Sequence, residues 1–267
     1  MTPAPPAVPA PVPASTPAPV QAPAFTAVVI DFFGTLTTSA PDEVWFQAAA
    51  ASAAPLGLEP ALWRETLTAS FVERATGALG DLPETFRALA RRCGVDPSEG
   101  ALAEACEARV KAQNELFVFR EDVLGALQAL KARGYRVGLL SDCTPELPVA
   151  WPQLAVSGFF DTAVFSCVEG LKKPNPAFFR LVAERLGVAP ADCLYVGDGG
   201  SRELSGAAAV GMTPLMLRAE DWHSNSAYDR EDDWAGAEIA SFTALISKID
   251  AAGLSARSLL AQHQDRD

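Results

Sequence analysis

Short runs of uninterrupted hydrophobic residues recur along the chain, and each ends close to a polar residue or a glycine. They lie at residues 27–30, 135–140, 162–166, 193–196 and 212–217. Apolar runs of this length without polar alternation are typical of strands buried on both faces of a parallel sheet. The later runs alternate with helical patterns at 175–186 and 202–210. The chain is therefore predicted to form a doubly wound α/β sheet with right-handed crossovers.

A long helical segment interrupts this alternation after the first predicted strand. Residues 40–118 contain helix-like stretches rich in Ala, Leu, Arg and Glu, at 43–54, 60–75, 82–93 and 99–117. Glycines between these stretches are expected to end the helices. We therefore predict an inserted helical domain at 40–118, with residues 25–39 and 119–267 forming the α/β core.

The first 24 residues are almost entirely Pro, Ala and Val, which favours an extended tail without helix or strand. The first basic residue is Arg64, so the start of the chain has no cationic targeting pattern. No apolar run approaches the roughly 20 residues that span a bilayer. We expect a cytoplasmic protein with no membrane segment.

Charge and composition exclude several functional classes. The 21 basic and 33 acidic residues give a net charge of −12, which repels nucleic acid and anionic membranes but permits a small anionic substrate near local cations. Five cysteines without CxxC spacing indicate reduced thiols. The only two histidines, His223 and His263, stand apart from other candidate ligands, which argues against a Ser-His-Asp or His-metal mechanism.

Polar residues stand at the carboxyl ends of three predicted strands. Asp31 ends the first strand, Ser141 the second, and Asp198 follows a later one. In open α/β sheets, ligands bind at this edge, at the point where the strand order reverses. The coincidence on three strands predicts a functional site there.

The residues around these positions resemble the four motifs of the haloacid dehalogenase superfamily. The matching segments are DFFGTL at 31–36, Ser141 after its hydrophobic run, Lys173 within GLKKPNP, and GDGGSRE at 197–203. They occur in the family's order over residues 27–217. The resemblance implies a Rossmann-like hydrolase core, and the insert at 40–118 is similar to the helical cap of subfamily I.

The resemblance also implies a magnesium-dependent reaction with a covalent intermediate on Asp31. Mg²⁺ would be held by Asp31, the backbone carbonyl of Phe33, Asp198 and Glu203, because this ion prefers oxygen ligands. Glu203 stands where many members of the family have aspartate.

The resemblance assigns three more residues to the substrate. Lys173 would supply positive charge, and the hydroxyls of Thr35 and Ser141 would donate hydrogen bonds to phosphoryl oxygens. The cap would exclude water and select the leaving group. The expected substrate is a small phosphorylated metabolite.

Position 33 departs from the family's phosphatases, which carry a second aspartate two residues after the nucleophile. Phe33 can neither protonate a leaving group nor activate water. Such acid–base help contributes about 10²–10⁴-fold, so a simple phosphomonoester should react slowly unless Asp142 or Glu169 takes that role.

Three functions therefore stay open. Family members that displace halide carry an aromatic residue at position 33 and work without metal, but they usually lack the Gly-Asp motif that this chain retains at 197–198. The alternatives to a magnesium-dependent phosphatase are such a dehalogenase-like hydrolase of carbon–halogen bonds, and a catalytically weak binding protein on the same scaffold.

Two further groups have simpler interpretations. In the insert, Arg64 and Arg74 are candidates for substrate contact, whereas the Trp and Phe residues there are expected in the helical core. The acidic residues near the end of the chain are predicted to form a solvated loop; these are Asp229, Glu231, Asp232 and Asp233.

Overall fold

The computed structural model describes residues 25–221 and 229–251. The predicted tail at 1–24 and both histidines lie outside the described residues. All five cysteines lie within them as free thiols. None of the helices in these two ranges has the length and apolar character needed to cross a membrane.

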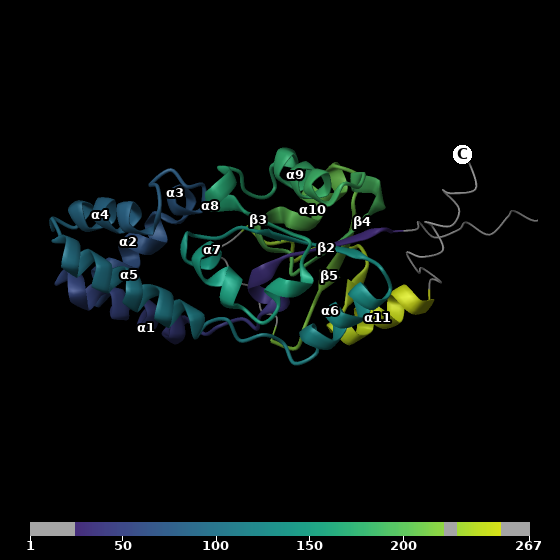
Figure 1. Ribbon diagram of the computed structural model, residues 1–267, viewed down its shortest axis with the longest axis horizontal. Helices are drawn as coiled ribbons and strands as arrows, with labels where there is room; N and C mark the ends of the chain where they lie inside the picture. The colour runs from purple at the N-terminus through teal and green to yellow at the C-terminus, as the bar shows by residue number, and fades with distance from the viewer. Residues whose placement is uncertain (1–24, 222–228, 252–267) are drawn as a thin grey trace, which may run out of the picture.

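In the described residues, six strands form one parallel sheet in the order β3-β2-β1-β4-β5-β6 (Figure 1). The strands are β1 (Ala27–Ile30), β2 (Arg136–Ser141), β3 (Thr162–Phe165), β4 (Cys193–Gly197), β5 (Thr213–Leu217) and β6 (Glu238–Ile239). The predicted doubly wound α/β fold is confirmed, and each strand from β1 to β5 ends within one residue of its predicted bounds. β6 was not predicted, because two residues are too short to give a hydrophobic pattern.

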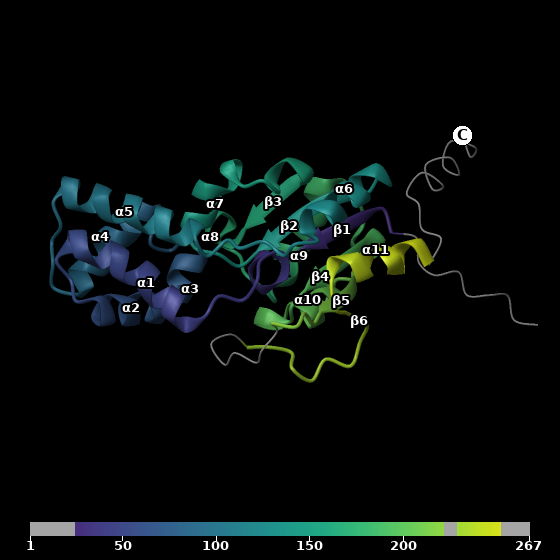
Figure 2. The same cartoon turned by 90° about the horizontal axis from the view of Figure 1, so that it is seen from below.

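Helices cover both faces of the sheet (Figures 1 and 2). On one face lie α6 (Val123–Ala132) and α11 (Phe242–Ala251), and on the other α9 (Pro176–Leu186) and α10 (Glu203–Ala209). Side chains of β1 alternate between two hydrophobic clusters: Val28 and Ile30 pack on the first face, and Ala27 and Val29 on the second. Burial on both faces explains why the strands appear in the sequence as unbroken apolar runs.

The centre of the sheet joins segments that are far apart in the chain. β1 pairs with β2 on one side and with β4 on the other, so the strand order reverses there. The backbone N–H of Asp31 donates to Val196 O at 3.0 Å. Residues that follow β1 and β4 therefore meet at the edge where ligands bind in such sheets.

Five helices form a separate group at one end of the molecule (Figure 1). They are α1 (Asp42–Ala53), α2 (Pro60–Ala69), α3 (Phe71–Ala75), α4 (Leu82–Arg92) and α5 (Glu99–Asn114). They enclose a hydrophobic cluster of their own, which includes Trp63, Phe86 and Leu89. We call this group the cap.

Two connecting segments join the cap to the sheet. They pair through an antiparallel bridge between Thr37 and Phe119, and Thr38 N donates to Val118 O at 2.8 Å. We propose that the domain boundary lies at this pair of segments, next to the expected limits of 40 and 118.

One predicted cap helix is divided in two. The expected stretch 60–75 breaks at Ser70, which separates α2 from α3. The Ser70 hydroxyl donates to Thr66 O at 2.8 Å, so it competes with the backbone for that acceptor.

The remaining helical elements are short. They are α7 (Glu146–Ala150), α8 (Ser166–Glu169), a turn at Phe32–Leu36, and single turns at Ala54–Leu56, Trp151–Gln153, Ser157–Phe159, Pro190–Asp192 and Gly200–Arg202.

The separate cap cluster leads to a stability prediction. Phe86 is fully buried in it, so Phe86→Ala should lower the free energy of unfolding by about 3–5 kcal/mol, measured by urea denaturation. Val72→Ala is the control, because this cap residue is 60% exposed and should change stability by less than about 0.5 kcal/mol. Equal effects of the two variants would contradict this account of the cap.

Candidate functional site

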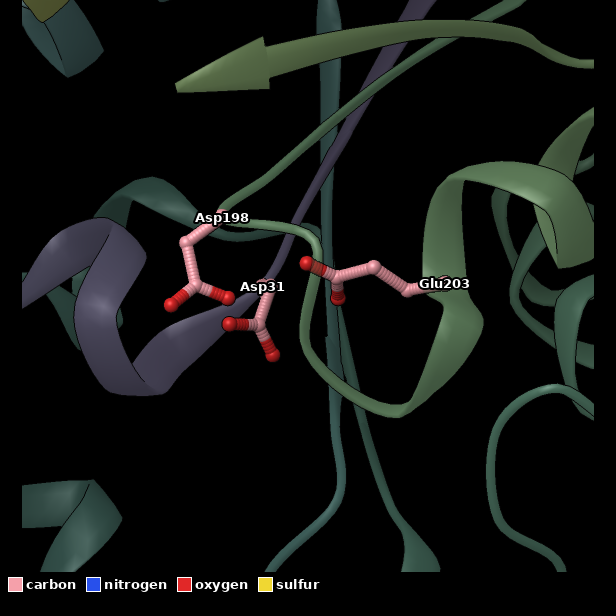
Figure 3. A group of neighbouring side chains, drawn as sticks. All are labelled: Asp31, Asp198 and Glu203. Carbon is pink, nitrogen blue, oxygen red and sulfur yellow. The ribbon is translucent and has the colours of Figure 1, made fainter. Parts of the chain in front are cut away.

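Three carboxyl groups meet at the carboxyl ends of the central strands. Asp31 follows β1, Asp198 follows β4, and Glu203 begins α10. Figure 3 shows Asp31 and Asp198 close together, with the Glu203 carboxyl group turned toward them. One carboxylate oxygen of each residue lies within 4.8 Å of the other two, and all three residues are buried. We refer to them as the carboxylate cluster.

Backbone geometry allows this close approach. Gly34 adopts a φ of +73°, a left-handed conformation that favours glycine, and a Cβ atom there would overlap Asp198 Oδ2. A Cβ at Gly197 would overlap the Glu203 carboxyl group. The two glycines therefore leave space for Asp198 and Glu203.

Lys173 bridges two members of the cluster. Its Nζ lies 2.5 Å from Asp31 Oδ1 and 2.6 Å from Glu203 Oε2, and the residue is only 2% exposed. Its backbone N–H donates to Asp142 Oδ1 at 2.9 Å, which fixes the loop before α9. Burial alone would lower the pKa of Lys173, but the Asp31 and Glu203 carboxylates hold it well above its usual value. Lys173 therefore carries a positive charge.

Glu203 is held by donors on both oxygens. Gly199 N donates to Oε1 at 2.9 Å, and the Tyr195 hydroxyl donates to Oε2 at 2.7 Å. Burial raises the pKa of Glu203 to about 7, and the Asp31 charge adds to the rise while Lys173 opposes it.

Arg230 neutralises part of the charge on Asp198. Its Nη1 lies 2.9 Å from Asp198 Oδ2, and its Nη2 donates to Asp198 O at 2.8 Å. Burial raises the pKa of Asp198, and the Glu203 charge raises it further, whereas the Arg230 charge lowers it. Arg230 was not predicted as a site residue, because it lies within an acidic segment 32 residues further along the chain than Asp198.

The prediction of a solvated acidic loop was wrong for Glu231. This residue is 2% exposed and accepts hydrogen bonds from Leu204 N at 2.7 Å and Ser205 N at 2.9 Å. The first amides of a helix lack acceptors within the helix, and Glu231 supplies one to α10. Asp229, Asp232 and Asp233 are exposed, as predicted.

Each of the two predicted hydroxyl donors has an acceptor within the chain. Thr35 Oγ1 donates to Asp31 Oδ2 at 3.1 Å, so it contacts the carboxylate instead of facing open space. Ser141 ends β2, and its Oγ lies 3.5 Å from Asp142 O. Both residues are fully buried, and neither is among the described residues that line the cavity considered next.

A cavity of about 320 Å³ separates the carboxylate cluster from the cap. Asp31, Lys173 and Asp198 line it from the core. Its apolar wall includes Phe33 and, from the cap, Trp45. Polar cap residues also reach it, namely Arg64, Arg74, Arg109 and Gln113. The cavity is therefore anionic at one end and carries cations at the other.

The suggested substitutes for an acid at position 33 are both already engaged. Asp142 lines the cavity, but its Oδ1 accepts a hydrogen bond from Lys173 N at 2.9 Å and its Oδ2 lies 3.6 Å from Lys172 Nζ. Glu169 pairs with Arg185 at 2.8 Å and is absent from the described lining.

The carboxylate cluster suits a hard divalent cation such as Mg²⁺. It offers only oxygen donors, and an ionised carboxylate oxygen that accepts one hydrogen bond keeps a further lone pair. Burial is the main cause that raises the pKa of Asp31, and the Asp198 charge contributes. Three carboxyl groups face two cationic side chains, Lys173 and Arg230, so the cluster has charge left for a bound cation.

A second buried ion cluster joins the cap to the core. Glu146 of α7 lies 2.9 Å from Arg109 Nε and 4.0 Å from Arg74 Nη1, and all three side chains are at most 6% exposed. Burial would raise the pKa of Glu146, but Arg109 and Arg74 hold it below its usual value. We call these residues the cap–core ion cluster. Arg74 was predicted as a candidate for substrate contact, whereas Arg109 was not, since no local motif marks it.

Comparisons with known proteins agree with this geometry. Residues 25–211 match the family model of haloacid dehalogenase-like hydrolases. The glyceraldehyde 3-phosphate phosphatase of Methanopyrus kandleri is 33% identical over 166 residues, which is 61% of this chain and 70% of that protein. The phosphoglycolate phosphatase of Escherichia coli is 35% identical over 103 residues, which is 38% of this chain but only 39% of that protein.

Two solved structures illustrate the likeness in fold. A 2-haloacid dehalogenase from Pseudomonas syringae pv. Tomato superimposes with a TM-score of 0.64 at 23% identity, covering 85% of this chain and 99% of that one. A family enzyme from Bacteroides thetaiotaomicron, in complex with magnesium and inorganic phosphate, superimposes with a TM-score of 0.56 at 19% identity, covering 76% and 98%.

The contact between Gly34 and Asp198 can be tested with alanine. Gly34→Ala should destabilise the protein more than Gly57→Ala in urea denaturation. Both positions have positive φ, which disfavours alanine by about 1–2 kcal/mol, but only at Gly34 does the new Cβ meet another group. Equal losses in the two variants would show that Gly34 serves the backbone alone.

The lowered pKa of Glu146 predicts a pH dependence. Its ionised form stabilises the fold above the ordinary value of 4.5, and this contribution disappears as pH falls through the lower folded-state pKa. Glu146→Gln should therefore destabilise by about 3–5 kcal/mol at pH 7, and by progressively less in acid.

Chemical denaturation across pH measures this effect. Glu99→Gln is the control, because Glu99 pairs with Arg87 but is 83% exposed, so solvent screens the interaction. A Glu146→Gln effect that stays constant down to the lowest pH would contradict the assignment.

Proposed function

We propose that this chain, which belongs to the haloacid dehalogenase-like hydrolases, is a Mg²⁺-dependent phosphatase that acts on a small phosphorylated metabolite through an aspartyl intermediate on Asp31. It is a hydrolase by family. The phosphatase names of the two curated relatives support phosphoryl transfer as the reaction.

The observation that carries the proposal is the meeting of Asp31, Asp198, Glu203 and Lys173 at the base of one cavity. A lone carboxylate at a strand end could simply cap a loop. Three buried carboxyl groups with a buried lysine, open to a cavity, are characteristic of a reactive site.

Asp31 is the proposed nucleophile. Thr35 Oγ1 and Lys173 Nζ each hold one of its oxygens, which orients the carboxylate at the cavity floor. Because the carboxylate and a phosphate group repel each other, catalysis needs positive charge between them. Lys173 supplies one charge, and a bound Mg²⁺ held by Asp31, Asp198 and Glu203 would supply more. The backbone carbonyl of Phe33 stays a predicted ligand.

Phe33 restricts the substrates that can react well. Asp142 pairs with Lys172 and Glu169 pairs with Arg185, so neither carboxyl group is placed as a free acid and the leaving oxygen departs without strong protonation. Leaving groups that are stable as anions, such as aryl or acyl oxygens, should therefore react faster than simple alkyl alcohols.

A dehalogenase-like reaction is the second candidate, and Phe33 favours it because a halide leaves unprotonated. Asp31 would then attack carbon, and no metal would be required. Halide release from 2-haloacids in the presence of EDTA would identify this activity. The third alternative, a weakly catalytic binding protein, is addressed by the substitution at Phe33 below.

The phosphatase proposal predicts strict dependence on metal and on Asp31. Phosphate release from a panel of aryl, acyl and alkyl phosphates should require Mg²⁺, disappear with EDTA, and fall at least about 10³-fold in Asp31→Asn. Asp42→Asn is the matched control, because Asp42 lines the same cavity with a 90% exposed side chain outside the carboxylate cluster. Turnover that survives both EDTA and Asp31→Asn would refute the proposal.

Restoring a carboxyl group at position 33 tests the rest of the site. Phe33→Asp should raise the rate on alkyl phosphates by about 10²–10⁴-fold, the range for acid–base catalysis, and should raise it less on aryl phosphates. Phe71→Asp, at another aromatic position in the cavity wall, is the control. No gain in Phe33→Asp, with folding intact, would mean that the site lacks more than this acid.

A further inference from the structure

Two polar side chains of α5 line the cavity opposite the carboxylate cluster. Arg109 and Gln113 are four residues apart, which places them on the same face of the helix. Arg109 is 5% exposed and Gln113 is 3% exposed. Strongly polar groups are seldom buried this deeply unless they have partners.

Their hydrogen bonding is incomplete. Among the described residues, the Gln113 side chain makes no hydrogen bond, and its Oε1 is fully buried. Arg109 uses only Nε, which donates to Glu146 at 2.9 Å, and this leaves its two terminal nitrogens without an acceptor. A buried side chain with unused donors that faces a cavity is suited to bind a ligand.

The charge of the surrounding groups defines the ligand. The cap–core ion cluster contains two arginines and one ionised glutamate, a net charge of +1. The terminal nitrogens of arginine form a fork that matches a carboxylate, and the Gln113 amide can donate to the same group. One carboxylate would both balance the charge and use these donors.

We propose that Arg109 and Gln113 form a subsite for a carboxylate on the leaving group, so that the substrate is a phosphate ester or acyl phosphate carrying a carboxylate. The inference rests on the proposed function, because it assumes that the phosphoryl group lies at Asp31. The cavity is continuous from Asp31 to Arg109, and its apolar wall at Phe33 and Trp45 lies alongside the body of the leaving group.

Matched pairs of substrates measure the effect of the carboxylate separately from that of the rest of the substrate. One pair is 3-phosphoglycerate and glycerol 3-phosphate, and the other is 4-(carboxymethyl)phenyl phosphate and 4-ethylphenyl phosphate. In each pair the wild-type kcat/KM should be about 10- to 100-fold higher for the compound that carries the carboxylate. This ratio corresponds to the free energy of a hydrogen bond to a charged group. The preference should appear mainly in KM.

Substitutions then test the two residues. Gln113→Met should lower the preference several-fold, and Gln113→Glu should reverse it, because a second negative charge repels the carboxylate. The double variant Arg109→Gln/Glu146→Gln should reduce the preference to about one. Both residues are replaced so that an ionised Glu146 is not left buried without its Arg109 partner. Arg87→Gln, at a partly exposed cap arginine, should leave the preference at its wild-type value.

The ratio within each pair distinguishes binding from structural damage, since damage lowers both rates together. A wild-type ratio near one, or a ratio that Gln113→Glu and the paired substitution leave unchanged, would overturn the subsite. If none of the four compounds is hydrolysed, the proposed function fails for these substrates. In that case, calorimetry with the Asp31→Asn variant measures the affinity for each compound of the same pairs. Equal affinities for the compounds with and without the carboxylate would overturn the proposed subsite.

Discussion

The ion pair between Lys173 and Asp31 is the interaction on which the rest of the site depends. Three buried carboxyl groups would repel one another and raise their own pKa values. Lys173 contacts two of them within 2.6 Å, and Arg230 contacts the third at 2.9 Å. These cations allow the acidic side chains to remain together at the end of the central strands, where the reversal of strand order opens a crevice.

The molecule is divided into a core that holds the carboxylate cluster and a cap that faces it. The sheet fixes the carboxylate cluster, whereas the cap has its own hydrophobic cluster and contributes the opposite wall of the cavity. In the proposed function, chemistry and substrate choice belong to different parts of the chain, which meet at the cap–core ion cluster. In the proposed function, Phe33 limits the choice of leaving group and the α5 residues select its charge.

Local patterns predicted most of the fold. Both faces of β1 are buried, so its sequence is uniformly apolar, and the polar residue that follows it is conspicuous. Ser70 broke a predicted helix, because its hydroxyl competes for a backbone acceptor. Arg230 and Arg109 could not be predicted, since their partners Asp198 and Glu146 lie 32 and 37 residues away in the chain and no local spacing links them. Pairings of this kind depend on how distant segments of the chain fold together.

The central claim is that the carboxylate cluster holds one divalent cation. Crystals grown with Mn²⁺ and examined by anomalous diffraction test it most directly. The account predicts one strong peak within coordinating distance of both Asp31 and Asp198, and its loss in Asp198→Asn. A peak elsewhere, or none between these two residues at saturating Mn²⁺, would contradict it.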